Sequence, residues 1–383
     1  MKSRLFSLLA CTLALLSGAE AATYSAFPLP SFELGYYVEQ AARNGEGAVY
    51  GVYGADERTR YVIYQESTGF IEIDPVAFGL EPYSAYLMGA DDIGKTLVFN
   101  TYSGQGMQVH FWTPGYFRSF DLPGDSYLGG LSGDGSLAYG YDYTQQAVYL
   151  LDHDGQTTAL ENSADVSVTA ISRDGSVILG NRYVDGQDAA VISTNGGAFQ
   201  NITIDGSLTV AEGLSGDGQT LALRTISTFG TPTPEELFSI YLYRGGEIEQ
   251  IYLPGLAQFL EVVSMSFDGQ RTLLQAYGIG TFDLEQGSDY LLHFSDFSFT
   301  LDLHDLLAAE VYSQGILYIE KLELSLDGRS LVGVGTLEDY SSVAFRVDDF
   351  DTLVVPEPET YALMGLGLGM IGVFVWKRRK KAA

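Results

Sequence analysis

Leu131-Ser132-Gly133-Asp134-Gly135-Ser136-Leu137 is the stretch that decides the fold. An apolar residue precedes a Ser-x-Asp-Gly turn, and a short β-prone run follows it. Glycine accepts positive φ and aspartate bonds nearby backbone, so Asp-Gly between apolar runs indicates a tight hairpin turn. Four further copies lie at 172–175, 215–218, 266–269 and 325–328. The predicted turn residues are therefore Asp134 and Gly135, Asp174 and Gly175, Asp217 and Gly218, Asp268 and Gly269, and Asp327 and Gly328.

The spacing of these turns indicates a repeat protein. Two degenerate copies come earlier, Asp92-Ile93-Gly94 and Asn44-Gly45, and the seven glycines are 49, 41, 40, 43, 51 and 59 residues apart. Each unit has room for four short strands, and four strands in about 40–50 residues is the period of a β-propeller blade. The sequence therefore predicts an all-β fold, a seven-bladed β-propeller. An open β-solenoid is the alternative, although its coils are usually shorter and more regular.

Both ends of the repeat region are expected to close the propeller. The segment after Gly328, up to Val355, has room for about three strands, and the segment 22–44 contains a strand-like run at 34–42. Together they complete one blade. Sharing a blade between N- and C-terminal strands removes the exposed sheet edges that would otherwise invite aggregation. We therefore expect the run 34–42 to pair with strands from 331–354.

The charge of the chain restricts its partners. The sequence has 20 basic and 49 acidic residues, and without its two ends it keeps 13 and 46, a net charge near −33. Such a surface repels nucleic acid and anionic lipid. Solubility outside a cell accounts for most of this charge, while cations, basic surfaces and neutral glycans remain acceptable partners.

Catalytic motifs are absent from the sequence. It has no Gly-x-Ser-x-Gly elbow, no His-Glu-x-x-His and no phosphate-binding glycine loop. Its only histidines are His110, His153, His293 and His304. With so many carboxylates, an acid/base pair for glycan cleavage could always be found, so no particular pair is informative. We predict no catalytic residues, no metal site and no cofactor.

Two residue types have alternative interpretations. The repeat aspartates could bind Ca²⁺ through oxygen, but they lack the dense ligand set of a calcium loop, so turn formation is preferred. The chain also has 26 tyrosines, several of them at strand-like spacing between Tyr36 and Tyr64. Aromatic residues at alternate positions usually fill the space between blades, and exposed ones stack well on sugar rings.

The C-terminus combines three features in order. The extended motif Val355-Pro356-Glu357-Pro358-Glu359-Thr360 precedes a glycine-rich apolar run, 361–376, and a basic cluster, 377–381. Proline fixes φ and biases the residue before it toward extended geometry. The apolar run is slightly short for a transmembrane helix, but long basic side chains can compensate by snorkelling. The basic cluster should stay cytoplasmic.

This tail resembles the PEP-CTERM sorting signal of Gram-negative bacteria, over about the last 28 residues. The resemblance implies that exosortase, a membrane-embedded transpeptidase, recognises Pro356, Glu357 and Pro358. It also implies transient membrane anchoring before the tail is removed. An ordinary single-span anchor with a proline-rich stalk is the alternative.

The N-terminus predicts export. Lys2 and Arg4 precede a short apolar core, and Ala19 and Ala21 offer small residues around a cut after Ala21. The only cysteine, Cys11, lies within this peptide, so the mature chain can form no disulfide. We therefore expect a signal peptide at 1–21 that is exported by the Sec translocon, a repeat ectodomain at 22–355, and a sorting signal at 356–383.

These features predict location better than chemistry. The precursor is expected in the inner membrane, and the processed protein in the cell envelope or outside the cell. We expect a non-enzymatic propeller with a binding or structural role in an exopolysaccharide (biofilm) matrix. A carbohydrate-active envelope enzyme on a propeller scaffold is the alternative.

Overall fold

A computed structural model describes residues 23–28, 36–41, 47–53, 59–65, 69–80, 85–103, 106–122, 125–184, 186–225, 239–253, 259–277, 289–297, 299–303, 307, 311–338 and 342–348. Residues 25–346 form one compact unit, and the two chain ends, 1–24 and 347–383, form a second. Of the second unit, the structure describes only the two residues at the start of the first strand and the two at the end of the last. The architecture below is that of residues 25–346.

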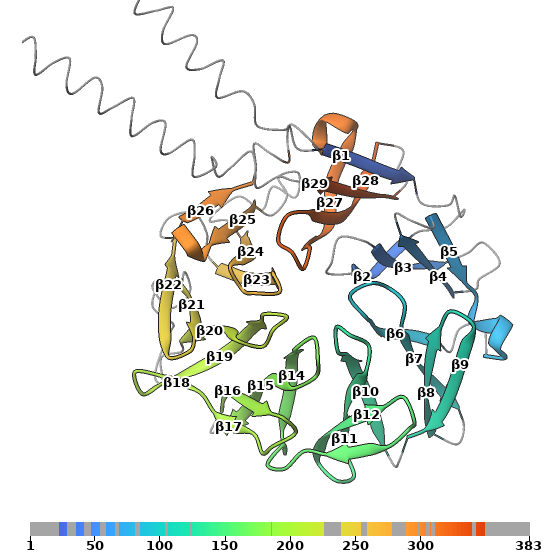
Figure 1. Cartoon of the computed structure of the whole chain (residues 1–383), viewed down its shortest axis with the longest axis horizontal. Coiled ribbons are helices and arrows are strands. Elements are labelled where there is room, and N and C mark those ends of the chain that lie inside the picture. The colour runs from blue at the N-terminus through green and yellow to red at the C-terminus, as the bar shows by residue number, and fades with distance from the viewer. Residues whose placement is uncertain are drawn as a thin grey trace, which may run out of the picture. The chain divides into compact units, whose positions relative to one another are not determined.

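The described strands form seven antiparallel sheets that follow one another around a ring (Figure 1). Six sheets consist of strands consecutive in sequence. The first three are β2 (Tyr36–Ala41), β3 (Gly47–Tyr53), β4 (Thr59–Gln65) and β5 (Gly69–Ile73); β6 (Ala85–Ala90), β7 (Leu97–Ser103), β8 (Gly106–Thr113) and β9 (Tyr116–Asp121); and β10 (Ser126–Leu131), β11 (Leu137–Asp142), β12 (Ala147–Asp152) and β13 (Thr157–Ala159).

The next three sheets follow the same order. They are β14 (Val166–Ile171), β15 (Val177–Val184), β16 (Gln187–Thr194) and β17 (Gln200–Asn201); β18 (Thr203–Ile204), β19 (Ser207–Leu214), β20 (Thr220–Thr225), β21 (Ser239–Arg244) and β22 (Glu247–Tyr252); and β23 (Phe259–Met265), β24 (Arg271–Tyr277), β25 (Asp289–Phe294) and β26 (Phe299–Asp302). Short 3₁₀ turns lie at η2 (Pro75–Phe78), η3 (Ser295–Phe297) and η4 (Tyr312–Gln314).

The last sheet combines both ends of the chain, as the sequence predicts, but with a different strand. Its order is β1 (Thr23–Pro28), β29 (Ser342–Asp348), β28 (Leu331–Leu337), β27 (Ile316–Leu324). The prediction that 34–42 pairs with the last unit is wrong, because β2 pairs with β3, from Tyr36 opposite Val52 to Ala41 opposite Ala48. A short connection through Asn44-Gly45 makes this local hairpin cheaper in loop entropy than pairing with the distant chain end.

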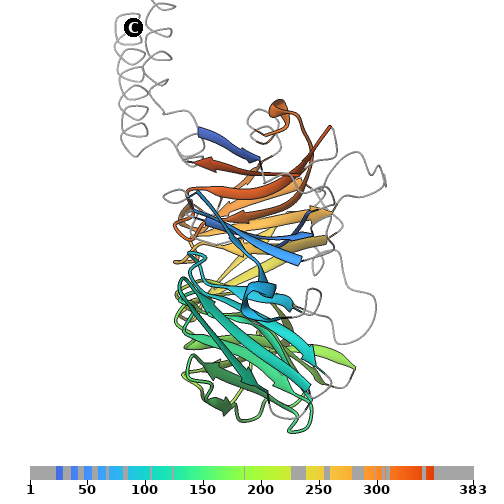
Figure 2. The same ribbon diagram turned by 90° about the vertical axis from the view of Figure 1, so that its right-hand side faces the viewer.

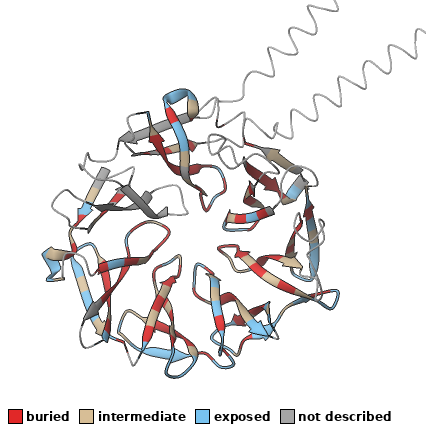
Figure 3. Cartoon of the chain, turned by 180° about the vertical axis from the view of Figure 1, so that it is seen from behind, coloured by how far each residue is buried: buried red, intermediate tan, exposed pale blue. Residues whose placement is uncertain are grey.

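The apolar core lies between neighbouring sheets. Val98 and Phe111 of the β6–β9 sheet pack in one cluster with Leu128 and Ala138 of the next sheet. The other interfaces repeat this arrangement, with buried residues on the strands that face the adjoining sheet (Figure 3). Since each sheet buries both faces against neighbours, a single blade has no complete core of its own.

Every inner strand carries an irregularity in register. The shifts fall between Leu128 and Gly130 in β10, between Val168 and Ala170 in β14, and at equivalent places in β2, β6, β19, β23 and β27. A β-bulge inserts one residue and increases the local twist. The bulges therefore let the inner strands twist as they line the centre of the ring.

The antiparallel order places the turns on two faces. Figure 2 shows the ring from the side, with strands running between these faces. Counted from the inner strand of each sheet, which is β19 in the five-stranded sheet, the turn between the first and second strands shares a face with the turn between the third and fourth. We call this the Asp-Gly face. The turn between the second and third strands lies on the opposite face.

Within the described part of the chain, we find no helix with the length and apolar character needed to cross a membrane. The predicted transmembrane run 361–376 and the predicted signal peptide 1–21 lie outside the described residues.

Candidate functional site

The five Ser-x-Asp-Gly turns share one hydrogen-bond pattern. In each, the serine hydroxyl donates to aspartate Oδ1, at 2.8, 2.8, 2.6, 2.7 and 2.6 Å for Ser132, Ser172, Ser215, Ser266 and Ser325. The same Oδ1 accepts the backbone N–H two residues later. Serine Oγ accepts the backbone N–H five residues later. All five serines are buried, so each turn satisfies its buried polar groups internally.

The glycine of each turn is required for two reasons. Gly135, Gly175, Gly218, Gly269 and Gly328 have φ between 65° and 75°, which side chains with a Cβ rarely adopt. Each also touches the preceding sheet, where the nearest atom to an added Cβ would be 2.4–2.8 Å away, on the side chain of Thr96, Leu137, Val177, Thr220 or Arg271. The turn glycine is therefore a contact between blades as well as a turn former.

Backbone hydrogen bonds link these turns from one sheet to the next. Asp92 N donates to Gly133 O and Asp134 N to Arg173 O, each at 2.8 Å. The series continues with Arg173 N to Gly216 O, Asp217 N to Phe267 O, and Phe267 N to Leu326 O. We call these linked turns, from Asp91 to Gly328, the turn ring. Its bonds connect six sheets, from β6–β9 to the mixed sheet.

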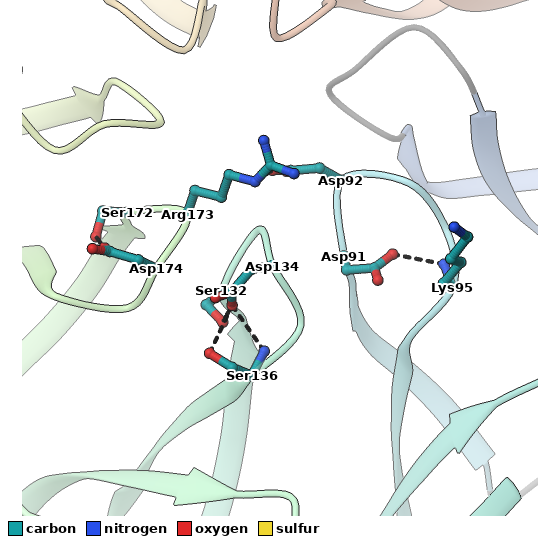
Figure 4. A network of polar contacts seen from close by, with 9 residues as sticks. All are labelled: Asp91, Asp92, Lys95, Ser132, Asp134, Ser136, Ser172, Arg173 and Asp174. Carbon is teal, nitrogen blue, oxygen red and sulfur yellow. Dashed lines mark hydrogen bonds and ion pairs between the residues drawn. The ribbon is translucent and has the colours of Figure 1, made fainter.

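An ion pair spans the turn ring on its inner side. The Arg173 guanidinium reaches over the turn at Gly133 toward the buried Asp92, with Nε 3.5 Å from Oδ2 (Figure 4). A Cβ on Gly133 would lie 2.3 Å from the Asp92 carboxylate. Beside it, Asp91 Oδ1 accepts the Lys95 N–H at 2.7 Å. Burial raises the pKa of the Asp91 carboxyl, while hydrogen bonds from Thr96 and Lys95 oppose that rise.

A cavity of about 270 Å³ lies at the centre of the inner strands. Its lining includes Asp92, Tyr139, Arg173, Lys321 and Glu323. Lys321 Nζ lies 3.5 Å from Glu323 Oε1, and Arg173 pairs with Asp92 as above. These four charged side chains form two ion pairs of opposite sign, so the lining of the cavity is polar without a large excess of either charge. We call it the central cavity and take it as the candidate site, because residues from several sheets line it.

The predicted turn aspartates lie around this site but do not converge on one ligand. Asp134, Asp174, Asp217, Asp268 and Asp327 each belong to a different sheet and use Oδ1 for their own turn. Hydrogen bonds from Ser176 lower the pKa of the Asp174 carboxyl. In the part of the chain that the structure describes, no three His, Cys, Asp or Glu residues gather in a way that could hold a metal ion.

This geometry predicts that calcium does not stabilise the fold. We expect EDTA to leave the melting temperature of the protein almost unchanged, because the aspartates stabilise their turns through backbone and serine donors. Thermal unfolding with EDTA, and with added Ca²⁺ as control, tests this. A fall of many degrees in EDTA, reversed by Ca²⁺, would contradict it, since it would show that ion binding is linked to folding.

The three described histidines lie apart and make structural contacts. His110 hydrogen-bonds Thr101 at 2.7 Å and Ser119 at 2.8 Å, and burial lowers its pKa to about 4. His153 Nε2 lies 2.6 Å from the carbonyl oxygen of Gly135. His293 contacts Glu249 at 3.0 Å; burial lowers its pKa although Glu249 favours the charged form. They belong to three different sheets. His304 lies outside the described residues.

Several features of the central cavity and its inner strands could not be predicted from the sequence. Arg173 occupies the variable position of its turn, so no pattern marks it. Asp92 belongs to a degenerate copy of the repeat, and only the structure shows that it faces Arg173 across another turn. The inner bulges also have no simple sequence signal, although Gly129 and Gly130 in β10 are consistent with one.

Comparison with known proteins identifies the C-terminus. Residues 354–380 match the family described as the PEP-CTERM protein-sorting motif, and Pro356, Glu357 and Pro358 lie within the matched segment. The chain ends in a PEP-CTERM sorting motif. No curated protein matches this PEP-CTERM chain.

Two solved structures resemble this chain at low sequence identity. The β-propeller domain of the Trilobed protease from Pyrococcus furiosus, described as having an open velcro topology, has 13% identity and a TM-score of 0.55. The match covers 83% of this chain and 95% of that domain. An inactive virginiamycin B lyase from Staphylococcus aureus has 12% identity, a TM-score of 0.49, and coverage of 85% and 99%. The first of these similarities shows the fold alone: residues 25–346 form a β-propeller.

Proposed function

We propose that this chain is the precursor of an exported envelope or exopolysaccharide-matrix protein. Exosortase recognises the tail at Pro356, Glu357 and Pro358 and removes it, after the apolar run has held the precursor transiently in the inner membrane. The match of residues 354–380 to the PEP-CTERM motif carries this proposal. The basic and apolar segments at the N-terminus support export by the Sec translocon, with a cut after Ala21.

The propeller has a binding or structural role in this proposal, without catalysis. It has seven blades, the seventh being the mixed sheet that β1 completes. Hydrogen bonds within the turn ring occupy its repeated aspartates, and the three histidines that the structure describes make structural contacts. The acidic surface, near −33 after processing, favours neutral glycans over nucleic acid or anionic lipid.

Processing in the native host tests this function. We expect mass analysis of the mature protein to recover no peptide from 377–381, because cleavage occurs upstream of the membrane run. Replacing Pro356, Glu357 and Pro358 by alanine should retain the tail and keep the protein in the membrane fraction. The matched control is Glu359→Ala, adjacent to the motif, which should be processed normally. Recovery of the intact tail on most wild-type molecules would refute the proposal.

A further inference from the structure

Three tyrosines gather on the face opposite the Asp-Gly face, where β10 begins and β11 ends. The ring centroids of Tyr127 and Tyr143 lie 5.8 Å apart, those of Tyr141 and Tyr143 5.2 Å, and those of Tyr127 and Tyr141 6.4 Å. Tyr143 is 57% exposed, whereas Tyr127 and Tyr141 are half-buried. We call these three residues the tyrosine patch. An exposed ring fixed by two others is a preformed aromatic surface.

A small cavity adjoins the patch between the β10–β13 and β14–β17 sheets. Its volume is about 160 Å³, and its lining includes Tyr127, Tyr139, Tyr141, Val148, Val166 and Val168. The cavity shares Tyr127 and Tyr141 with the patch, whereas Tyr143 lies outside its lining.

Polar groups surround this aromatic surface. Asp125 and Asp165 are exposed, and the Asp165 N–H donates to the Tyr141 hydroxyl oxygen at 3.4 Å. The Tyr143 N–H donates to the carbonyl oxygen of Asp125 at 2.9 Å, and the Thr144 N–H donates to Asp142 Oδ1 at 2.8 Å, which orders the turn carrying Tyr143. Small-molecule sites commonly combine apolar and aromatic walls with a few fixed polar groups. Hydroxyl groups of a ligand could donate to the carboxylates, whereas an anionic ligand would be repelled.

We propose that the tyrosine patch binds a pyranose ring of a neutral polysaccharide, an inference that rests on the proposed matrix function. The C–H face of the sugar stacks on Tyr143, and its hydroxyls face Asp125 and Asp165. A tyrosine hydroxyl is protonated and able to donate at neutral pH, and burial, together with Tyr143 and Tyr141, raises the pKa of Tyr127 further. The overall negative charge of the chain disfavours anionic polysaccharides.

Affinity electrophoresis of the full chain tests this assignment, in a detergent that contains no sugar. The gels contain galactomannan, dextran or laminarin as neutral probes and alginate as the anionic probe. We expect at least one neutral probe to retard the wild type. Tyr143→Ala should weaken that binding by at least about tenfold, because it removes the stacking surface. Tyr143→Phe keeps the ring and should restore most of the binding.

The matched control is Tyr183→Ala. Tyr183 is 64% exposed near the end of β15, at the equivalent place in the next sheet, and lies outside the patch. The Tyr183→Ala variant should bind polysaccharide like the wild type. Both alanine variants should keep the melting temperature of the wild type. Equal binding by Tyr143→Ala and Tyr183→Ala would overturn the assignment of the sugar site to the tyrosine patch, but not the proposal that the protein binds polysaccharide. Retardation by alginate alone would overturn the assignment to a neutral sugar. If no probe retards the wild type, the patch and the polysaccharide-binding role both fail, whereas tail processing is judged separately.

Discussion

Deletion of β1 (Thr23–Pro28) is expected to remove several kcal/mol from the free energy of unfolding and to cause association. The reason is the order of the mixed sheet, in which β1 is the only N-terminal strand and pairs with β29. Without it, β29 becomes an outer edge, although Val343, Phe345 and Val347 on that strand are buried. Urea unfolding and light scattering of the deleted protein, with the predicted signal peptide retained, measure both effects.

The control for this deletion is another outer strand. β13 (Thr157–Ala159) is also the last strand of its sheet, and its three residues are exposed. Replacing them with glycine and serine should cost little, because β13 joins its own sheet locally and does not connect the chain ends. Equal losses for the two changes, or a soluble monomer of unchanged stability without β1, would show that β1 does not close the ring.

Gly218→Ala is expected to destabilise the propeller by roughly 2–4 kcal/mol. Gly218 has φ +73°, and an added Cβ would lie 2.8 Å from Val177 Cγ2 and 3.1 Å from Val177 Cβ in the preceding sheet. Val177 is a buried, β-branched residue that has few rotamers with which to move away. The substitution therefore adds an overlap between blades to the cost of the left-handed backbone. Urea unfolding of the purified protein gives the change in stability.

Gly206→Ala separates these two contributions. Gly206 has φ +79°, but nothing lies within 4 Å of the position that a Cβ would occupy. It should lose only the backbone term, about 1 kcal/mol. If the two variants lose equal stability, the contact between Gly218 and Val177 carries no energy, and the turn glycines act on the backbone alone.

Structural features that depend on neighbouring residues could be predicted from the sequence. Asp217-Gly218 could be recognised as a turn, because glycine provides the positive φ and the aspartate accepts hydrogen bonds from its own turn. Repetition of that turn led to the propeller. The same reasoning could not find β1, which has no turn signal and whose partner lies roughly 300 residues away. It selected 34–42 instead, a run with stronger strand character that forms a local hairpin.

The candidate sites could not be predicted either, because their residues come together only in the folded propeller. Arg173 and Asp92 meet only because two turns face each other across a third. Tyr127 lies on β10 and Tyr143 on the turn after β11, and their contact depends on the register that sets Tyr127 opposite Tyr141. A composition rich in tyrosine is consistent with both packing and exposure, and the fraction of each ring that solvent reaches follows only from the packed sheets.

Pairing of β1 with β29 also affects when the molecule can finish folding. A ribosome makes β1 first and β29 last, so the first strand must wait for nearly the whole chain before its partner exists. The six sheets of consecutive strands can form in order as the chain emerges from the translocon, whereas the mixed sheet must wait for the end of the chain. The incomplete ring therefore stays open at one place until the last strand has emerged. The ring can close only after the last repeat is present, and that repeat ends a few residues before the sorting motif.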